Sequence, residues 1–148
     1  MIRINIPFRL ISSLANDLPI EIKMKLILAI GTGSFIGGIL RYLLSHFIHT
    51  KFFSAFPFGT FFVNIVGCFF MGIVFAVADR NMLSNEWRLF LATGLLGGFT
   101  TFSAFSSEVL NLLRDGQLGY AALYATSSVI LGLLATFVGV SIVRIIGQ

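Results

Sequence analysis

The sequence has 148 residues, of which 57% are hydrophobic and 11% are charged, and its formal net charge is +4. Soluble domains carry about 25% charged residues, so this composition excludes an ordinary soluble domain, and its hydrophobicity excludes a disordered chain. The basic residues mostly flank apolar segments, which favours orientation in a lipid bilayer over binding of nucleic acid.

Residues 1–23 precede the first apolar segment and carry several charges and two prolines. Their apolar stretch is too short for a span and lacks the small-residue cleavage site of a signal peptide. They form either a short amphipathic arm on the membrane surface or an extension that is not native, with Met24 as the true start. We therefore divide the chain into an N-terminal extension, 1–23, and a transmembrane domain, 24–148.

Four apolar segments are long enough for helices that cross the bilayer, which takes about 20 residues. They lack the alternation of membrane-barrel strands. A serine, Ser84, is placed to cap the third helix, and Trp87 follows it at the level of the membrane interface. The fold class is an all-α membrane protein, multi-pass in the cell (inner) membrane, with helices expected near 25–48, 58–79, 87–113 and 118–145.

Small residues recur at helical spacing, as in Gly33 and Gly37 or Gly94 and Gly98. This spacing lets membrane helices approach closely, and each pair taken alone indicates only packing. Once the extension is set aside, basic residues are nearly balanced between the two sides of the membrane. The positive-inside rule then barely fixes an orientation, so either the extension decides it or the protein inserts both ways.

The third apolar segment contains Gly94, Gly97 and Gly98, followed by Thr100 and Thr101. Each glycine costs a helix about 1 kcal/mol, and the hydroxyl groups offer the backbone alternative hydrogen-bond partners. We expect a break near 97–101. A broken backbone inside a bilayer is tolerated where it is buried in protein or faces a water-filled cavity, and its freed carbonyls can bind a cation. The alternative is a glycine-rich packing notch.

Beyond the break, Phe102 and Phe105 share one helix face, and Ser103 and Ser106 share the adjacent face. Aromatic ring edges are positive, and hydroxyl groups donate hydrogen bonds. Such a wall suits a small, strongly hydrated anion, because donors can replace its water without a fixed cation that would trap it. Asn64 adds an amide in the second segment. The alternative is a core stripe with incidental serines.

Two charged residues, Arg41 and Glu108, lie inside or near the spans. Charge at that depth is costly, so each is expected to face a partner or a wet vestibule that leads to the pore, unless it extends to the interface. His46 and His49 have a spacing that could ligate a metal, but no further ligand is near in sequence, so interfacial histidines are the better interpretation. No catalytic constellation is present, which indicates that the protein is not an enzyme.

These segments resemble the Fluc (CrcB-like) fluoride channels over nearly all of residues 24–145. The resemblance rests on 37–42 in the first span, on 57–60 with Asn64 in the second, and on 97–106 with Glu108 in the third. It implies a passive, fluoride-selective channel that lets cells lose accumulated fluoride and so relieves fluoride toxicity. It also implies an antiparallel, dual-topology homodimer with two pores, and a structural sodium ion at the dimer centre that is not transported.

Individual roles follow from the same resemblance. The carbonyl groups of Gly97 and Thr100 correspond to the ligands of Na⁺. The pore residues correspond to Phe102 and Phe105, with an amide from Asn64 and a polar track that includes Ser103 and Ser106. Ala104 departs from the family pattern, which often has threonine there, and this removes one hydroxyl from the track.

Two other classes fit four short spans. A small multidrug-resistance exporter needs a carboxylate in its first helix to exchange protons for cations, and residues 25–48 contain no Asp or Glu. A non-transporting membrane scaffold has no positive support in the sequence. Both rank below the fluoride channel.

Overall fold

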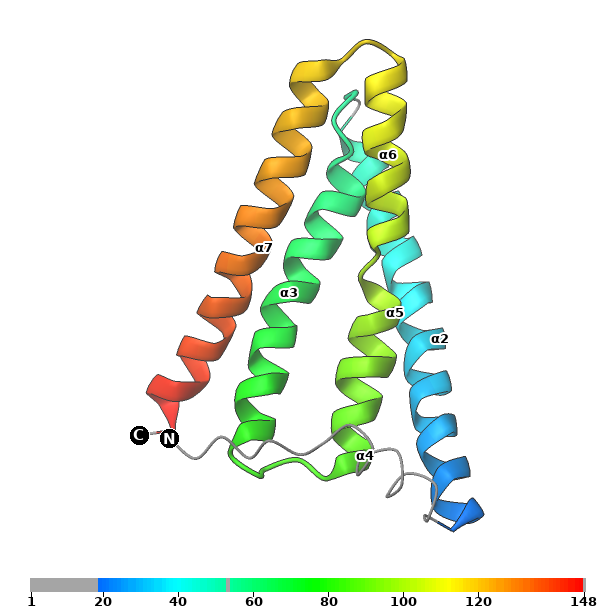
Figure 1. Cartoon of the computed structure of the whole chain (residues 1–148), viewed down its shortest axis with the longest axis vertical. Helices are drawn as coiled ribbons and strands as arrows, with labels where there is room; N and C mark the ends of the chain where they lie inside the picture. Colours follow the sequence, from blue (N-terminus) through cyan, green and yellow to red (C-terminus); the bar gives the residue numbers. More distant parts are fainter. Residues whose placement is uncertain (1–18, 53, 148) are drawn as a thin grey trace, which may run out of the picture.

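The computed structural model describes residues 19–52 and 54–147, and its regular elements in these ranges are all helices. Three spans are single helices: α2 (Ile20–Lys51), α3 (Phe58–Asp79) and α7 (Leu118–Ile146). The remaining span, Asn85–Arg114, consists of several shorter helices. All four spans are long and apolar enough to cross a membrane, which confirms the expected all-α fold (Figure 1).

The helix bounds agree closely with the sequence except at the first span. Helix α2 begins at Ile20, directly after Pro19, rather than near residue 25. Proline is compatible with the start of a helix because the first amides have no helical acceptor. Residues 20–23, assigned above to the extension, therefore continue the first span. Residues 1–18 of the extension lie outside the described residues.

The third span changes its helix type twice before it breaks. It begins with α4 (Asn85–Arg88), whose N-cap Ser84 accepts a hydrogen bond from the Trp87 amide at 3.4 Å, as predicted. A π-helical segment, η1 (Leu89–Leu96), and a short helix, α5 (Gly97–Phe99), follow. Thr100 and Thr101 are then extended, with ψ angles of 155° and 122°, before α6 (Phe102–Arg114) begins. The break thus falls on the two threonines, and the preceding glycines stay helical.

The four spans pack as two close pairs, α3 on α7 and α2 on η1. Glycines allow the close approach in both pairs. A Cβ atom at Gly72 of α3 would overlap the Thr136 carbonyl of α7, and one at Gly37 of α2 would overlap the Leu95 carbonyl of η1. Without an aqueous driving force between helices, the van der Waals contact that such proximity allows is one of the interactions that hold helices together in lipid.

The packing of α3 on α7 predicts the effect of a single added methyl group. Overpacking costs about 1–3 kcal/mol, so we expect Gly72→Ala to lower the thermal unfolding midpoint of the detergent-solubilised protein. Gly31→Ala is the matched control, since a Cβ atom there meets no atom within 4 Å and alanine favours a helix over glycine by about 1 kcal/mol. Equal midpoints for the two variants would contradict the close packing at Gly72.

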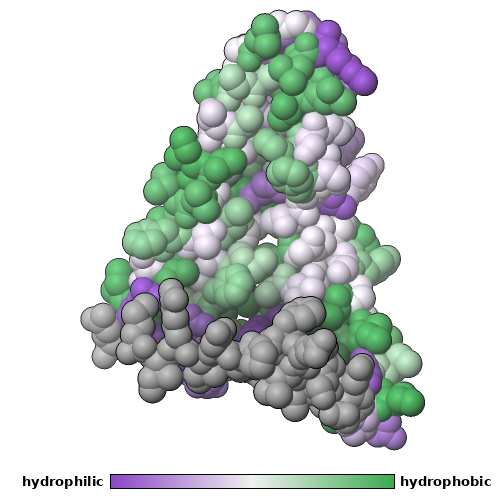
Figure 2. All heavy atoms as spheres, in the orientation of Figure 1, coloured by the Kyte–Doolittle hydropathy of each residue, from purple (hydrophilic) through white to green (hydrophobic). Residues whose placement is uncertain are grey.

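Large apolar side chains are mostly exposed on this chain, as expected for a surface in contact with lipid. Figure 2 shows hydrophobic residues over much of the visible face and hydrophilic ones towards its ends, with a further hydrophilic patch between them. The buried aromatic cluster is small and lies where α3, α6 and α7 meet. It contains Phe56, Leu112, Ala121 and Tyr124.

Candidate functional site

The break in the third span is stabilised by a side chain from α3. Asn64 Oδ1 accepts a hydrogen bond from the Thr101 amide at 2.9 Å, and Asn64 Nδ2 donates to the Thr101 carbonyl at 3.1 Å. The Thr101 hydroxyl then accepts from the Ala104 amide at 3.2 Å and caps α6. Protein groups thereby provide hydrogen-bond partners for backbone groups at the break, which would otherwise be unpaired in lipid.

Because of the same contacts, two carbonyl groups no longer accept the hydrogen bonds that they would accept in a continuous helix. In a continuous helix, the Thr101 amide would donate to the Gly97 carbonyl, and the Ala104 amide to the Thr100 carbonyl. Here these amides donate to Asn64 and to the Thr101 hydroxyl instead. The Gly97 and Thr100 oxygens therefore lack their helical donors, and carbonyl oxygens are ligands that hard cations accept.

The predicted pore residues Asn64, Phe102 and Phe105 line one groove of about 300 Å³, together with Thr100. Residues of α3, α6 and α7 form its walls. The rings of Phe102 and Phe105 lie with their centroids 5.4 Å apart. Phe102 is 79% exposed, whereas Phe105 packs on the aromatic cluster, with its ring centroid 5.1 Å from that of Tyr124.

The two predicted serines do not line this groove. Ser103 Oγ lies 3.1 Å from the Thr101 hydroxyl, Ser106 donates to the Phe102 carbonyl at 2.9 Å, and both residues are exposed. The hydroxyl-bearing residues that line the groove are instead Thr100 and Thr101 at the break and Ser128 and Thr136 of α7. Ser128 Oγ is buried and has no hydrogen-bond partner among the described residues.

No residue of the fourth span was predicted to belong to the site, although the sequence of that span contains a periodic pattern. Tyr124, Ser128, Gly132 and Thr136 recur every fourth residue, which places them along one helix face. Their spacing identifies a shared face but does not identify the element that this face meets.

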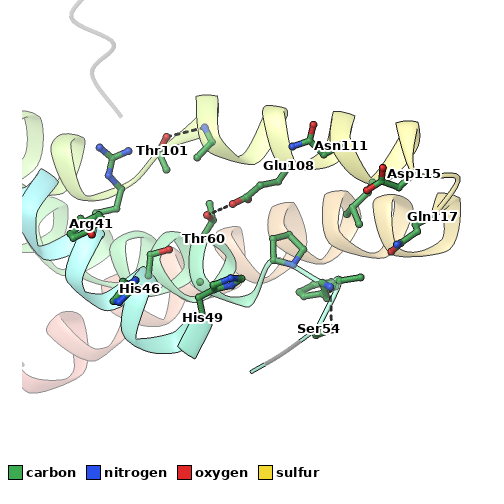
Figure 3. Close-up of a pocket in the computed structure, with 18 residues that line it drawn as sticks. Arg41, His46, His49, Ser54, Thr60, Thr101, Glu108, Asn111, Asp115 and Gln117 are labelled. Carbon is green, nitrogen blue, oxygen red and sulfur yellow. Dashed lines mark hydrogen bonds between the residues drawn. The ribbon is translucent and has the colours of Figure 1, made fainter. Parts of the chain in front are cut away.

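Arg41 and Glu108 line a second, larger cavity of about 650 Å³ (Figure 3). Its walls come from α2, the start of α3, most of the length of α6 and the adjoining loops. Thr101 lines both this cavity and the groove, so the two spaces are neighbours at the break. The further polar residues of the cavity lining are Tyr42, Ser45, His46, His49, Ser54, Thr60, Asn111, Asp115 and Gln117.

The carboxyl group of Glu108 is held from two sides within the bilayer. The Thr60 hydroxyl donates to Oε1 at 2.6 Å, and the Tyr124 hydroxyl donates to Oε2 at 2.7 Å. Thr60 is buried and Tyr124 is 0% exposed. Glu108 therefore links α3, α6 and α7 through charge-assisted hydrogen bonds, which are stronger than neutral ones.

The two histidines also line the large cavity, but the structure gives them no metal-binding geometry. His46 stacks on Tyr42 with a centroid distance of 5.9 Å. Within residues 19–52 and 54–147, no group of three or more His, Cys, Asp or Glu side chains could hold a metal ion.

One of the four membrane-spanning helices is broken beside a polar cavity, and two of its carbonyl groups have lost their helical hydrogen bonds. These features define a multi-pass membrane protein of the channel or transporter class. Residues 28–140 match the family described as CrcB-like protein, Camphor Resistance (CrcB). The chain belongs to this family.

Several relatives carry the name "Fluoride-specific ion channel FluC". One such protein from Thermus thermophilus is 46% identical over 112 residues, which cover 76% of this chain and 88% of that protein. The one from Flavobacterium psychrophilum is 43% identical over 122 residues, covering 82% and 98%. The one from Phocaeicola vulgatus is 44% identical over 117 residues, covering 79% and 97%. By name these relatives are ion channels, and membership of their family makes this chain a transport protein and not an enzyme.

Proposed function

We propose that the protein is a fluoride-selective channel through which fluoride leaves the cell passively, so that its toxicity is relieved. The observation that carries this proposal is the groove in which Phe102, Phe105 and Asn64 meet beside the break. The names of the relatives, fluoride-specific ion channels, support the choice of ion. The ion moves down its own gradient, and the path needs no coupled proton or cation.

The path runs from the large cavity, past Thr101, into the groove. Arg41 lines the cavity and attracts anions there, while the carboxyl group of Glu108 is occupied by two hydroxyl donors. In the groove, the ring edges of Phe102 and Phe105 and the hydroxyl of Ser128 replace part of the hydration shell of fluoride. No fixed cation lines the groove among the described residues, so binding stays weak enough for the ion to leave.

Ser103 and Ser106 belong to the path on the exposed face of α6, beside the groove. Their exposed hydroxyls form a row of polar atoms along the helix next to the phenylalanines. Ser106 remains able to accept a hydrogen bond while it donates to the Phe102 carbonyl. Ala104 lies between them and contributes no hydroxyl, so the row of hydroxyl groups has one member fewer than in a chain with threonine at this position.

A structural sodium ion, bound by the Gly97 and Thr100 carbonyls of two copies, completes the channel. Two oxygens from each copy give a site of four hard ligands, which suits an alkali cation. The support is the loss of the helical donors of both carbonyls. The two copies lie antiparallel, as the nearly balanced basic residues allow, and the sodium ion sits between them and is not transported.

Release of fluoride from liposomes tests this function. Vesicles that contain the protein and potassium fluoride are given a potassium ionophore, and a fluoride electrode records the released ion. We expect rapid release of fluoride, slow release of chloride, and less release when sodium is replaced by a large organic cation. Release no faster than from protein-free vesicles would contradict the proposed function, whereas release without sodium dependence would contradict only the sodium site.

A further inference from the structure

The two hydrogen bonds between Asn64 and Thr101 pair one side-chain amide with both polar backbone atoms of one residue. An amide side chain can do this because it carries an acceptor and a donor side by side. A carboxylate keeps the acceptor and loses the donor, and an apolar side chain loses both. The contact spans 37 positions in the sequence and joins the middle of α3 to the break.

The Thr101 amide has two possible acceptors inside the membrane. One is Asn64 Oδ1, which it uses at 2.9 Å. The other is the Gly97 carbonyl, its normal partner in a continuous helix. A buried amide without an acceptor costs several kcal/mol in lipid, so the amide takes one of the two. The Asn64 side chain and the Gly97 carbonyl therefore compete to accept the hydrogen bond of the Thr101 amide. The Gly97 oxygen is free only while Asn64 accepts this bond.

We propose that Asn64 is a positioning residue for the cation site, in addition to its place in the groove. It keeps Thr101 extended and thereby leaves the Gly97 carbonyl free to bind sodium. This proposal rests on the sodium site proposed above. The alternative is that Asn64 acts only as a hydrogen-bond donor to the anion, in which case its loss lowers fluoride flux and leaves sodium binding unchanged.

Asn64→Leu tests the proposal because leucine keeps the size of the side chain and removes both hydrogen bonds. Sodium binding is measured on the purified protein as the sodium concentration that gives half of the thermal stabilisation. We expect this concentration to rise about tenfold or more, which corresponds to about 1.4 kcal/mol of lost binding. Asn64→Asp keeps the acceptor for the Thr101 amide, so its shift should be smaller. The control is Phe105→Ile, which alters the groove but not the break, and its value should equal that of the parent.

A second measurement follows the break without reference to either ion. An extended residue advances the chain by about 3.3 Å and a helical residue by about 1.5 Å, so closing the break at two residues shortens the span by about 3–4 Å. Spin labels at Glu86 and Arg114, which are exposed near the two ends of the span, report this length by pulsed electron resonance. Cys68 is first replaced by serine, and labelled protein is mixed with an excess of unlabelled protein.

We expect Asn64→Leu to shorten the distance between the labels and Asn64→Asp to shift it less. If the parent gives no thermal response to sodium, the proposed cation site fails, and the distance alone still decides whether Asn64 holds the break. An unchanged distance and an unchanged sodium midpoint in both variants, with reduced fluoride flux, would overturn the proposal. Should Asn64→Leu fail to fold, the same readings on Asn64→Ala decide, because alanine also removes both the acceptor and the donor and must shift both values in the same direction.

Discussion

Replacing Phe102 by isoleucine is expected to lower fluoride flux by about two- to tenfold. Isoleucine keeps much of the bulk but has no positive ring edge, and a favourable ring interaction contributes about 0.5–1.5 kcal/mol. Its loss at the top of the barrier reduces the rate about tenfold for each 1.36 kcal/mol. Phe105→Ile should act in the same direction, since its ring lies 5.4 Å from that of Phe102.

The two phenylalanines differ in what else they support. Phe102 is 79% exposed in the single chain, so its replacement costs little packing, whereas Phe105 packs against the aromatic cluster. Phe35, which is 70% exposed on α2 and lines neither cavity, provides the control Phe35→Ile with parent-like flux. Flux is read from the fluoride electrode, and the thermal midpoint shows whether the fold is kept. Parent-like flux in both Phe102→Ile and Phe105→Ile would show that these rings are packing residues only.

The second large effect concerns the stability of the fold at Glu108. Glu108→Leu leaves the hydroxyls of Thr60 and Tyr124 without their acceptor, and both residues are buried. An unsatisfied buried group costs about 1–3 kcal/mol, so the two together should destabilise the protein by about 2–6 kcal/mol. We expect a large fall in the thermal midpoint of the detergent-solubilised protein, or no folded protein at all.

Glu108→Gln separates the loss of hydrogen bonds from the loss of charge. Glutamine keeps one acceptor, and its amide group can donate to the other hydroxyl oxygen. Because these neutral hydrogen bonds are weaker than charge-assisted ones, the midpoint of Glu108→Gln should lie below that of the parent and well above that of Glu108→Leu. If the leucine variant is as stable as the glutamine variant, the two hydroxyl contacts do not brace the three helices.

The sequence predicted the spans and the break because both depend on local chemistry. Apolar length places the helices, and glycines followed by hydroxyl residues weaken a helix wherever they occur. The break could not be placed more closely than residues 97–101, because what fixes it at Thr100 and Thr101 is Asn64, a partner distant in sequence. Local helix propensity cannot predict a contact between residues that are far apart in the sequence.

The position of the two serines outside the groove has a geometric origin. Helical spacing shows that Ser103 and Ser106 share a face of α6, but it does not show which neighbour that face meets. Two extended residues before Phe102 also reset the rotation of α6 relative to α5, so no register could be carried across the break. For the same reason, Ser128 and Thr136 of α7 could be assigned to the groove only once the helices were placed.

The break also sets two helix ends of opposite polarity almost end to end in the middle of the bilayer. Helix α6 begins at Phe102, and the first amides of any helix point outward without a helical acceptor, so this end carries a partial positive charge of about half a proton. The carbonyl end of α5, at Phe99, is the negative counterpart. Because lipid screens such dipoles far less than water does, each end attracts an ion of the opposite sign without any ionised side chain, and neither attraction changes with pH.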